Sequence, residues 1–298
     1  MKSAPAQVAD WLTGRRHRAA LVAAVLAFLP LTYVLSGATV ALVTLHGGAR
    51  EGLVVSAGAA LAAGVWVLVL GGNVVNALGY LAILFLPALG LAVVLRRTQS
   101  LSLCLQLAVL GAAALLIGMF AWPGDPIAFW ETVVGQWDAM LRQAGVEIPG
   151  FVERVAPYMP GSFAGSMLLL VLMSVFIGRW LHAAKTEGLE FGPEFRRLRL
   201  GYVIAAAAAL TGAGALIAGS LLLNNLAIVL LGACLLQGLS IAHAVRATMR
   251  LSPGWLVLLY VLLGLPTPLL PAATAALIGL GLVDNWIDVR GKVNAKWK

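Results

Sequence analysis

Long stretches of this sequence contain no charged side chain, and that absence constrains the fold more than any other feature. Residues 53–70, for example, contain no Asp, Glu, Lys or Arg. About 20 consecutive apolar residues in an α-helix span the hydrocarbon core of a bilayer. Over the whole chain only 11% of residues are charged, whereas soluble domains have roughly 25%. The sequence therefore predicts an all-α, polytopic transmembrane helical bundle.

The apolar runs predict about 8–10 membrane segments. Two runs, 19–45 and 256–284, are longer than one span of about 20 residues, and each contains helix-breaking residues. Pro30 and the Ser36–Gly37 pair interrupt the first run, and three prolines interrupt the second. Ten crossings result if both runs are hairpins, and eight if each is one broken span. The remaining runs predict single spans at 53–70, 74–95, 101–120, 163–181, 200–221 and 226–245.

The distribution of basic residues predicts the orientation. The connector 179–200 carries five Lys or Arg residues, and such residues collect in cytoplasmic loops. The same rule places the N-terminus, 1–18, and the tail, 286–298, in the cytoplasm, and the acidic loop 122–162 outside it. We therefore expect 1–298 to form a single integral membrane domain in a bacterial inner (plasma) membrane.

The composition also bears on function. A net charge of +8 is explained by the cytoplasmic loops, so we expect no nucleic-acid partner. Cys104 and Cys234 lie in apolar runs without the spacing of a disulfide framework or a zinc site. The one Gly-Lys pair, Gly291–Lys292, is followed by Val293 and so is no phosphate-binding loop. We expect no enzyme activity, catalytic residue, metal or cofactor.

The acidic loop contains a predicted amphipathic helix. Apolar side chains recur there at helical spacing and share one face. With two tryptophans, this helix is expected to lie at the membrane–water interface as an anchor; the alternative is a lid over an outward-facing pocket. The face consists of Trp130, Val133, Val134, Trp137, Met140 and Leu141.

Small side chains repeat along the first apolar segment. Ala20, Ala23, Ala24 and Ala27 would let another helix approach closely, because packing drives helix association in lipid. We expect this face to contact a membrane-protein partner.

Three stretches together resemble a known family. They are GPEFRRLRLG at 192–201, IAHAVRATMRLSPGWLVLLYVLL at 241–263 and LGLVDNWIDVRGK at 280–292. The chain is similar in them to the YybS-like family of bacterial inner-membrane proteins, whose function is unknown. That family resembles the substrate-binding S-components of energy-coupling-factor transporters, which typically have six spans, fewer than are expected here. The resemblance implies a solute-binding membrane component with a transmembrane coupling partner.

Two groups of polar residues are candidates for function. Polar groups in membrane helices usually face the bundle interior or a cavity, although they also join helices by hydrogen bonds. The candidates for substrate binding are Asn73, Asn76, Gln106, Asn224, Asn225, Gln237 and Ser240. The candidates for cytoplasmic ion pairing or coupling are Arg196, Arg197, Arg199, His243, Arg246, Arg250, Asp284 and Asp288.

The expected function is that of a multi-pass membrane protein that binds or helps to transport a small-molecule solute, with the lipid bilayer as its surroundings. The alternative is a non-catalytic scaffold that recruits partners through the 179–200 connector and the basic tail. A third hypothesis, a lipid-modifying enzyme, requires an outer cleft with paired carboxylates such as Glu131 and Asp138.

Overall fold

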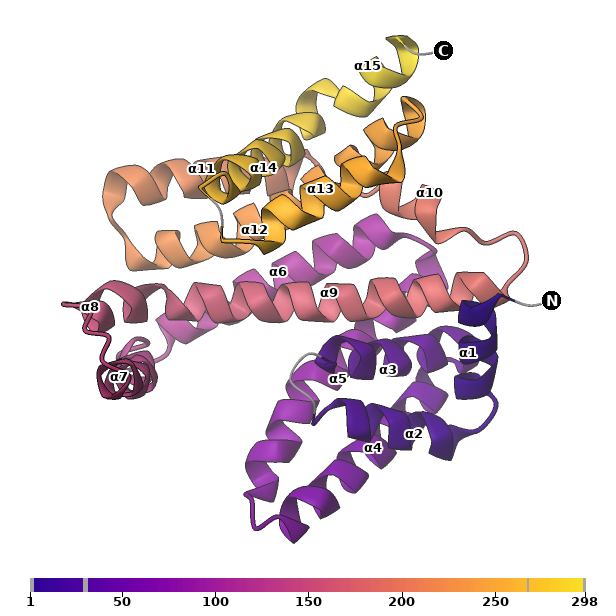
Figure 1. Cartoon of the computed structure of the whole chain (residues 1–298), viewed down its shortest axis with the longest axis horizontal. Helices are drawn as coiled ribbons and strands as arrows, with labels where there is room; N and C mark the ends of the chain where they lie inside the picture. The colour runs from indigo at the N-terminus through magenta and orange to yellow at the C-terminus, as the bar shows by residue number, and fades with distance from the viewer. Residues whose placement is uncertain (1–2, 29–31, 267, 297–298) are drawn as a thin grey trace. The chain divides into compact units, whose positions relative to one another are not determined.

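The structure, a computed structural model, describes residues 3–28, 32–266 and 268–296 (Figure 1). The predicted helix breaker Pro30 lies outside these residues. Within them the chain is helical and no strand occurs, which confirms the all-α prediction. The structure describes the backbone but not the side chain of five further residues, which are Asn76, Ala77, Tyr80, Asn294 and Lys296.

The chain divides into two compact units. Unit 1 comprises Met1–Ala108 and Met167–Phe195, and unit 2 comprises Val109–Ser166 and Arg196–Lys298. The helices α6 and α9 each contribute to both. The helices of unit 1 are α1 (Ala4–Thr13), α2 (Arg16–Leu26), α3 (Tyr33–Gly47), α4 (Ala49–Val69), α5 (Val74–Thr98), α6 (Leu101–Ala121), α9 (Met159–Lys185) and α10 (Phe191–Arg196).

Unit 2 contains the remaining elements. It also includes the end of α6 and the start of α9. Its own elements are α7 (Ala128–Gln143), α8 (Phe151–Val155), the 3-10 turn η1 (Ala156–Tyr158), α11 (Tyr202–Ala218), α12 (Leu221–Thr248), α13 (Pro253–Gly264), α14 (Leu270–Ile287) and α15 (Val289–Lys296).

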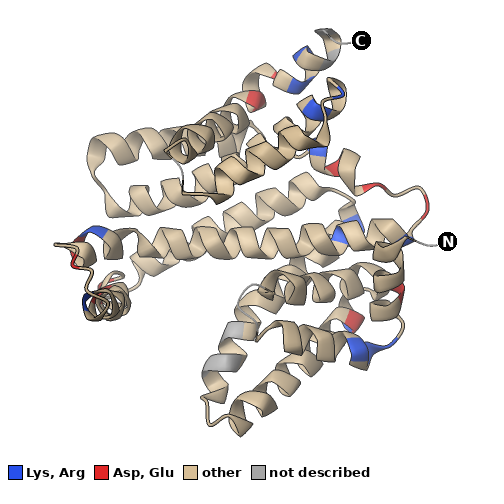
Figure 2. Ribbon diagram, viewed as in Figure 1, with Lys and Arg blue, Asp and Glu red and all other residues tan. Residues whose placement is uncertain are grey.

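Six described helical segments are long and apolar enough to cross a membrane, so the protein is a multi-pass membrane protein. Each of the ten predicted segments contains a helix. Charged residues gather at helix ends and in connecting segments, while the apolar helices are almost free of them (Figure 2). The six segments are Ala49–Val69, Leu81–Thr98, Leu101–Ala121, Phe151–Lys185, Leu221–Thr248 and Leu270–Ile287.

The first long apolar run is a pair of short helices. α2 has 11 residues and α3 has 15. At a rise of 1.5 Å per residue they are about 16 and 22 Å long, less than the ~30 Å of the hydrocarbon core. Neither helix is therefore long enough to cross the core alone.

The Ser36–Gly37 pair, one of the two predicted interruptions of this run, does not break a helix. Ser36 and Gly37 lie inside α3 and are buried, and the helices separate between Leu26 and Tyr33. The two small residues serve packing instead: the Ser36 hydroxyl donates to the Ala23 carbonyl at 2.6 Å. A Cβ on Gly37 would lie 2.5 Å from the Ser174 hydroxyl oxygen of α9.

The alanine face of α2 is also used inside unit 1. Ala23, Ala24 and Ala27 are buried in one cluster with side chains of α3, α4 and α5, and a Cβ on Gly58 of α4 would lie 3.2 Å from the Ala20 methyl group. Small residues do bring helices together here, as predicted, but the neighbours belong to the same chain. The proposed partner-protein contact through this face is therefore wrong.

In unit 2, α12 and α14 approach at two glycines. A Cβ on Gly281 would lie 1.9 Å from the Cys234 carbonyl oxygen, and one on Gly238 would lie 2.1 Å from that of Leu277. Such close backbone approach is the usual role of small residues in membrane helix packing.

Candidate functional site

The helix ends at residues 10–16, 44–51, 96–99 and 179–185 meet in unit 1, and we call this region the basic end. Several cations connect these helix ends. Arg96 at the end of α5 donates to the carbonyls of Thr44 and Leu45 at 3.3 and 3.0 Å. These carbonyls belong to the last turn of α3, where a positive charge is favourable, and the Thr44 carbonyl also accepts the Gly48 N–H at 2.8 Å.

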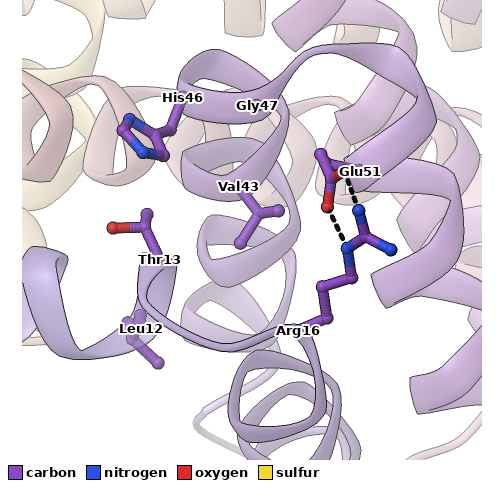
Figure 3. A pocket seen from close by; sticks show the side chains of 7 residues that line it. All are labelled: Leu12, Thr13, Arg16, Val43, His46, Gly47 and Glu51. Atoms are coloured by element: carbon purple, nitrogen blue, oxygen red, sulfur yellow. Dashed lines mark hydrogen bonds and ion pairs between the residues drawn. The ribbon is translucent and has the colours of Figure 1, made fainter.

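The basic end contains a cavity of about 290 Å³ (Figure 3). It opens where α1 ends, α2 begins, α3 ends and α4 begins. Since α2 and α3 form the short hairpin, the cavity lies at the hairpin's open end. Its lining residues are Leu12, Thr13, Arg16, Val43, His46, Gly47 and Glu51.

Arg16 and Glu51 form a two-point ion pair on the cavity wall (Figure 3). The Arg16 guanidinium donates from Nε and Nη2 to the two Glu51 carboxylate oxygens. The Arg16 side chain is exposed and Glu51 is about three-quarters buried. This planar arrangement is the one by which arginine also binds the carboxylate or phosphate of a ligand.

Other polar side chains surround the cavity. Lys185, at the end of α9, donates to the Thr13 hydroxyl at 2.8 Å and lies 3.4 Å from the Asp10 carboxylate. The His46 ring on the wall lies 6.5 Å from that of His182, centroid to centroid. The Nδ1 atom of His182 is buried and has no hydrogen-bond partner.

Arg179 is the most buried charged side chain of the basic end, with 1% of its surface exposed. It donates twice to Glu194 of α10, at 2.9 and 2.6 Å, and once to the Gln99 side-chain oxygen at 2.7 Å. These bonds hold the connector helix α10 against α9. Phe176 of α9 packs against Phe195 of α10, with ring centroids 5.7 Å apart.

The predicted polar residues do not form one site. Asn73 and Gln106 lie in unit 1, with Asn73 in an exposed turn and Gln106 half-buried. The side chain of Asn76 lies outside the described residues. The other four are on α12 of unit 2, where Asn225 and Gln237 are separated by 12 residues, about 18 Å of helix.

Gln237 and Ser240 belong to a buried polar cluster of unit 2. The Gln237 amide donates to Asp284 at 3.2 Å, and its oxygen accepts the Leu200 backbone N–H at 2.7 Å. Arg290 donates to Asp284 at 2.6 Å and to the Ser240 hydroxyl at 3.4 Å. The Gln237 side chain thereby joins α12 to α14 and to the segment that precedes α11.

Asn225 joins the start of α12 to the start of α9. Its side-chain oxygen accepts the Gly161 N–H at 2.6 Å, and its amide donates to the carbonyls of Pro157 and Leu221 at 2.8 Å. Both amide hydrogens and one of the two lone pairs of the oxygen are therefore engaged by backbone groups. The adjacent Asn224 is half-buried.

The candidates for ion pairing are divided among several contacts. Asp288 pairs with Arg199, one of its predicted partners. Asp284 instead pairs with Arg290, which the sequence did not single out. The His243 ring nitrogen Nε2 lies 2.9 Å from the Tyr260 hydroxyl, while Arg246 has a buried Nε atom without a partner.

The three other basic candidates are Arg196, Arg197 and Arg250. The Arg196 carbonyl accepts a hydrogen bond from Arg290 at 2.7 Å. Arg197 and Arg250 are exposed, and Arg250 has a left-handed backbone with φ of 53° at the end of α12.

Sequence reasoning missed Arg16, Glu51, Arg179 and Arg290. Arg16 and Glu51 are 35 residues apart and carry no motif, so only the hairpin brings them together. Among the described residues, no group of three or more His, Cys, Asp or Glu side chains is arranged to hold a metal ion. Comparison with protein-family models, curated proteins and solved structures gives no match for this chain.

Proposed function

We propose that this multi-pass membrane protein binds a small solute with an anionic group in the cavity of the basic end, as a solute-binding or transport component. The observation that carries the proposal is the polar cavity at the open end of a hairpin too short to cross the membrane. Interrupted helices are common around the substrate sites of membrane transporters.

Arg16 is the group expected to bind the solute. It is exposed and lies on the cavity wall, and its guanidinium has the geometry to hold a carboxylate or phosphate at two points. It holds Glu51 in the same way. An incoming anion therefore exchanges with Glu51, while Lys185 and Arg96 maintain a positive surrounding.

The direction of the cavity follows from the proposed orientation. The basic residues favour cytoplasmic N- and C-termini in a bacterial inner membrane, so the cavity opens to the cytoplasm. The resemblance of three stretches to the YybS-like family supports a solute-binding role.

Two variants of the ion pair test this proposal. Arg16→Gln and Glu51→Gln both break the same pair, so their effects on folding are matched. Arg16→Gln removes the anion-binding group, whereas Glu51→Gln removes its competitor. We therefore expect opposite effects on solute binding.

The measurement is the shift in thermal unfolding temperature with inorganic phosphate, sulfate and a series of small carboxylates, because a ligand that binds the native state stabilises it. At least one compound should stabilise the unmodified protein and Glu51→Gln but not Arg16→Gln. Arg15→Gln, at the exposed neighbouring residue outside the cavity lining, should respond like the unmodified protein. Equal responses of Arg16→Gln and Arg15→Gln would contradict the site.

A second candidate is the scaffold function. The basic residues Arg197, Arg250 and Lys292 of unit 2 are exposed, as recruitment of an acidic partner requires. Purification in mild detergent distinguishes the two functions. A scaffold retains a polypeptide that is lost on substitution of these three residues by Gln, whereas a solute-binding component retains a small molecule.

A further inference from the structure

The helix α7 of unit 2 has two adjacent apolar strips. The first, the inner strip, contains Trp130 and Val134, which are buried. They pack in one cluster with Ile127 and Ala156, and with half-buried side chains from the end of α6, α8 and the start of α9. This strip fixes α7 to the protein.

The second, the outer strip, lies beside it, and three of its four side chains are exposed. It consists of Phe129, Val133, Trp137 and Met140, which fall within about 80° of one another on a helix of 3.6 residues per turn. The exposed fractions of Phe129, Trp137 and Met140 are 66%, 42% and 65%. The sequence predicted one apolar face on this helix. In the structure one strip of that face packs against the protein, and the other is exposed.

The membrane-spanning segments that pack against α7 also expose apolar side chains. In the part of α6 within unit 2, Leu110, Leu115 and Ile117 are exposed, and Trp122 follows the end of α6 with 77% of its surface exposed. Tyr158 and Phe163, around the start of α9, are also exposed. Exposed aromatic residues at the ends of membrane spans are typical of the bilayer interface.

The opposite side of α7 is polar. Glu131 is exposed there, and Arg142 pairs with Asp138 one turn away at 2.8 Å. Helices that bind membranes by charge carry Lys and Arg on this side. The segment 122–162 instead has five carboxylates and two guanidinium groups, a formal net charge of −3.

We propose that α7 lies in the plane of the membrane, with its outer strip inserted at the boundary between lipid headgroups and acyl chains. The partner is the lipid of the bilayer that the neighbouring spans cross. The attraction comes from apolar burial and is independent of anionic lipid, because α7 offers no basic face to it. The helix thus marks the depth of the membrane boundary at the ends of α6 and α9.

The experiment places a fluorescent NBD label at single cysteines in a Cys104→Ala/Cys234→Ala background. Labels at Phe129→Cys, Trp137→Cys and Met140→Cys report on the outer strip, and labels at Glu131→Cys and Ala139→Cys are the matched controls on the same helix. All five positions are exposed, so labelling leaves the inner strip intact. Unchanged gel-filtration profiles and unfolding temperatures verify the fold.

The labelled proteins are reconstituted in phosphatidylcholine vesicles, with and without phosphatidylglycerol, and quenched with a phospholipid that carries a nitroxide near its headgroup. We expect severalfold stronger quenching at the outer strip than at the controls, and the same ratio in both vesicles. Equal quenching on both faces would overturn the insertion, and a requirement for phosphatidylglycerol would overturn the apolar mechanism. Outer-strip labels shielded from both the nitroxide lipid and aqueous iodide would show that protein covers the strip, which also contradicts the proposal.

Discussion

Arg290 and Asp284 form an ion pair inside unit 2, with Nη2 and Oδ2 2.6 Å apart and exposed fractions of 7% and 0%. The same Asp284 oxygen accepts the Gln237 amide, and Arg290 also donates to the Arg196 carbonyl. Removal of one partner from such a buried pair lowers the stability of the fold strongly, because the charge of the other partner stays buried without compensation. The Arg290–Asp284 pair and its hydrogen bonds join α12, α14, α15 and the start of the segment that leads to α11.

Asp284→Asn is therefore expected to destabilise the protein strongly. Removal of one partner from a buried ion pair costs about 3–5 kcal/mol. Asp288→Asn is the matched control, since Asp288 pairs with Arg199 where both side chains are about half exposed, and such surface pairs contribute about 0–1 kcal/mol. The measurement is thermal unfolding in detergent, and similar losses for both variants would contradict the assigned role of Asp284.

The close contact of α12 and α14 makes a second prediction. Gly281→Ala would place a methyl group 1.9 Å from the Cys234 carbonyl oxygen, so the helices must separate. Gly279→Ala is a control on the same helix, because its Cβ meets nothing within 4 Å. Alanine is favoured over glycine in a helix by about 1 kcal/mol.

We expect Gly281→Ala to lower the unfolding temperature and Gly279→Ala to leave it unchanged or raise it. Both proteins are purified in the same detergent and compared for yield of the monodisperse species. The packing account fails if Gly281→Ala is as stable as Gly279→Ala.

Asn225 is expected to be structural. Asn225→Ala leaves the Gly161 N–H and the Pro157 carbonyl without their partner, and an unsatisfied buried polar group costs about 1–3 kcal/mol. Hydrogen exchange of a peptide that covers 157–165 should become faster in this variant, whereas the neighbouring Asn224→Ala should leave it unchanged. If Asn225→Ala leaves hydrogen exchange of this peptide unchanged but abolishes binding of a solute, the prediction that Asn225 binds substrate is favoured instead.

Arg179 is expected to hold α10 in place. Arg179→Gln removes both bonds to Glu194, so α10 and the preceding turn should open more often. The exposed Glu187 and Glu190 lie in that turn, and a glutamate-specific protease should cleave there faster. Arg197→Gln, at an exposed connector residue, is the control; equal cleavage in both variants would contradict the role of Arg179.

The helices could be predicted from the sequence, whereas the contacts among their ends could not. Uncharged runs long enough to span a bilayer leave helix as the stable structure, since backbone groups must be satisfied within the segment. Ser36 and Gly37 were interpreted as a break because such residues also favour turns. Ser36 instead bonds to Ala23 of α2, and the role of Gly37 depends on α9, more than 130 residues further along the chain.

The partner of Asp284 shows why spacing alone was insufficient. A helical pattern favours partners three or four residues away, but Arg290 is six residues further on. Asp288 between them has a left-handed backbone, with φ of 45°, and ends α14. This change of backbone conformation between α14 and α15 lets the Arg290 side chain reach Asp284. A single non-glycine residue in this conformation gives no clear sequence signal.

Native mass spectrometry tests most directly whether the cavity at Arg16 and Glu51 binds a solute. The unmodified protein, Arg16→Gln and Arg15→Gln are purified from cells in mild detergent and released intact in the gas phase. We predict that the unmodified protein and Arg15→Gln retain a non-lipid anion that Arg16→Gln loses. Retention of the same molecule by Arg16→Gln, or its absence from all three proteins, would contradict solute binding at this cavity.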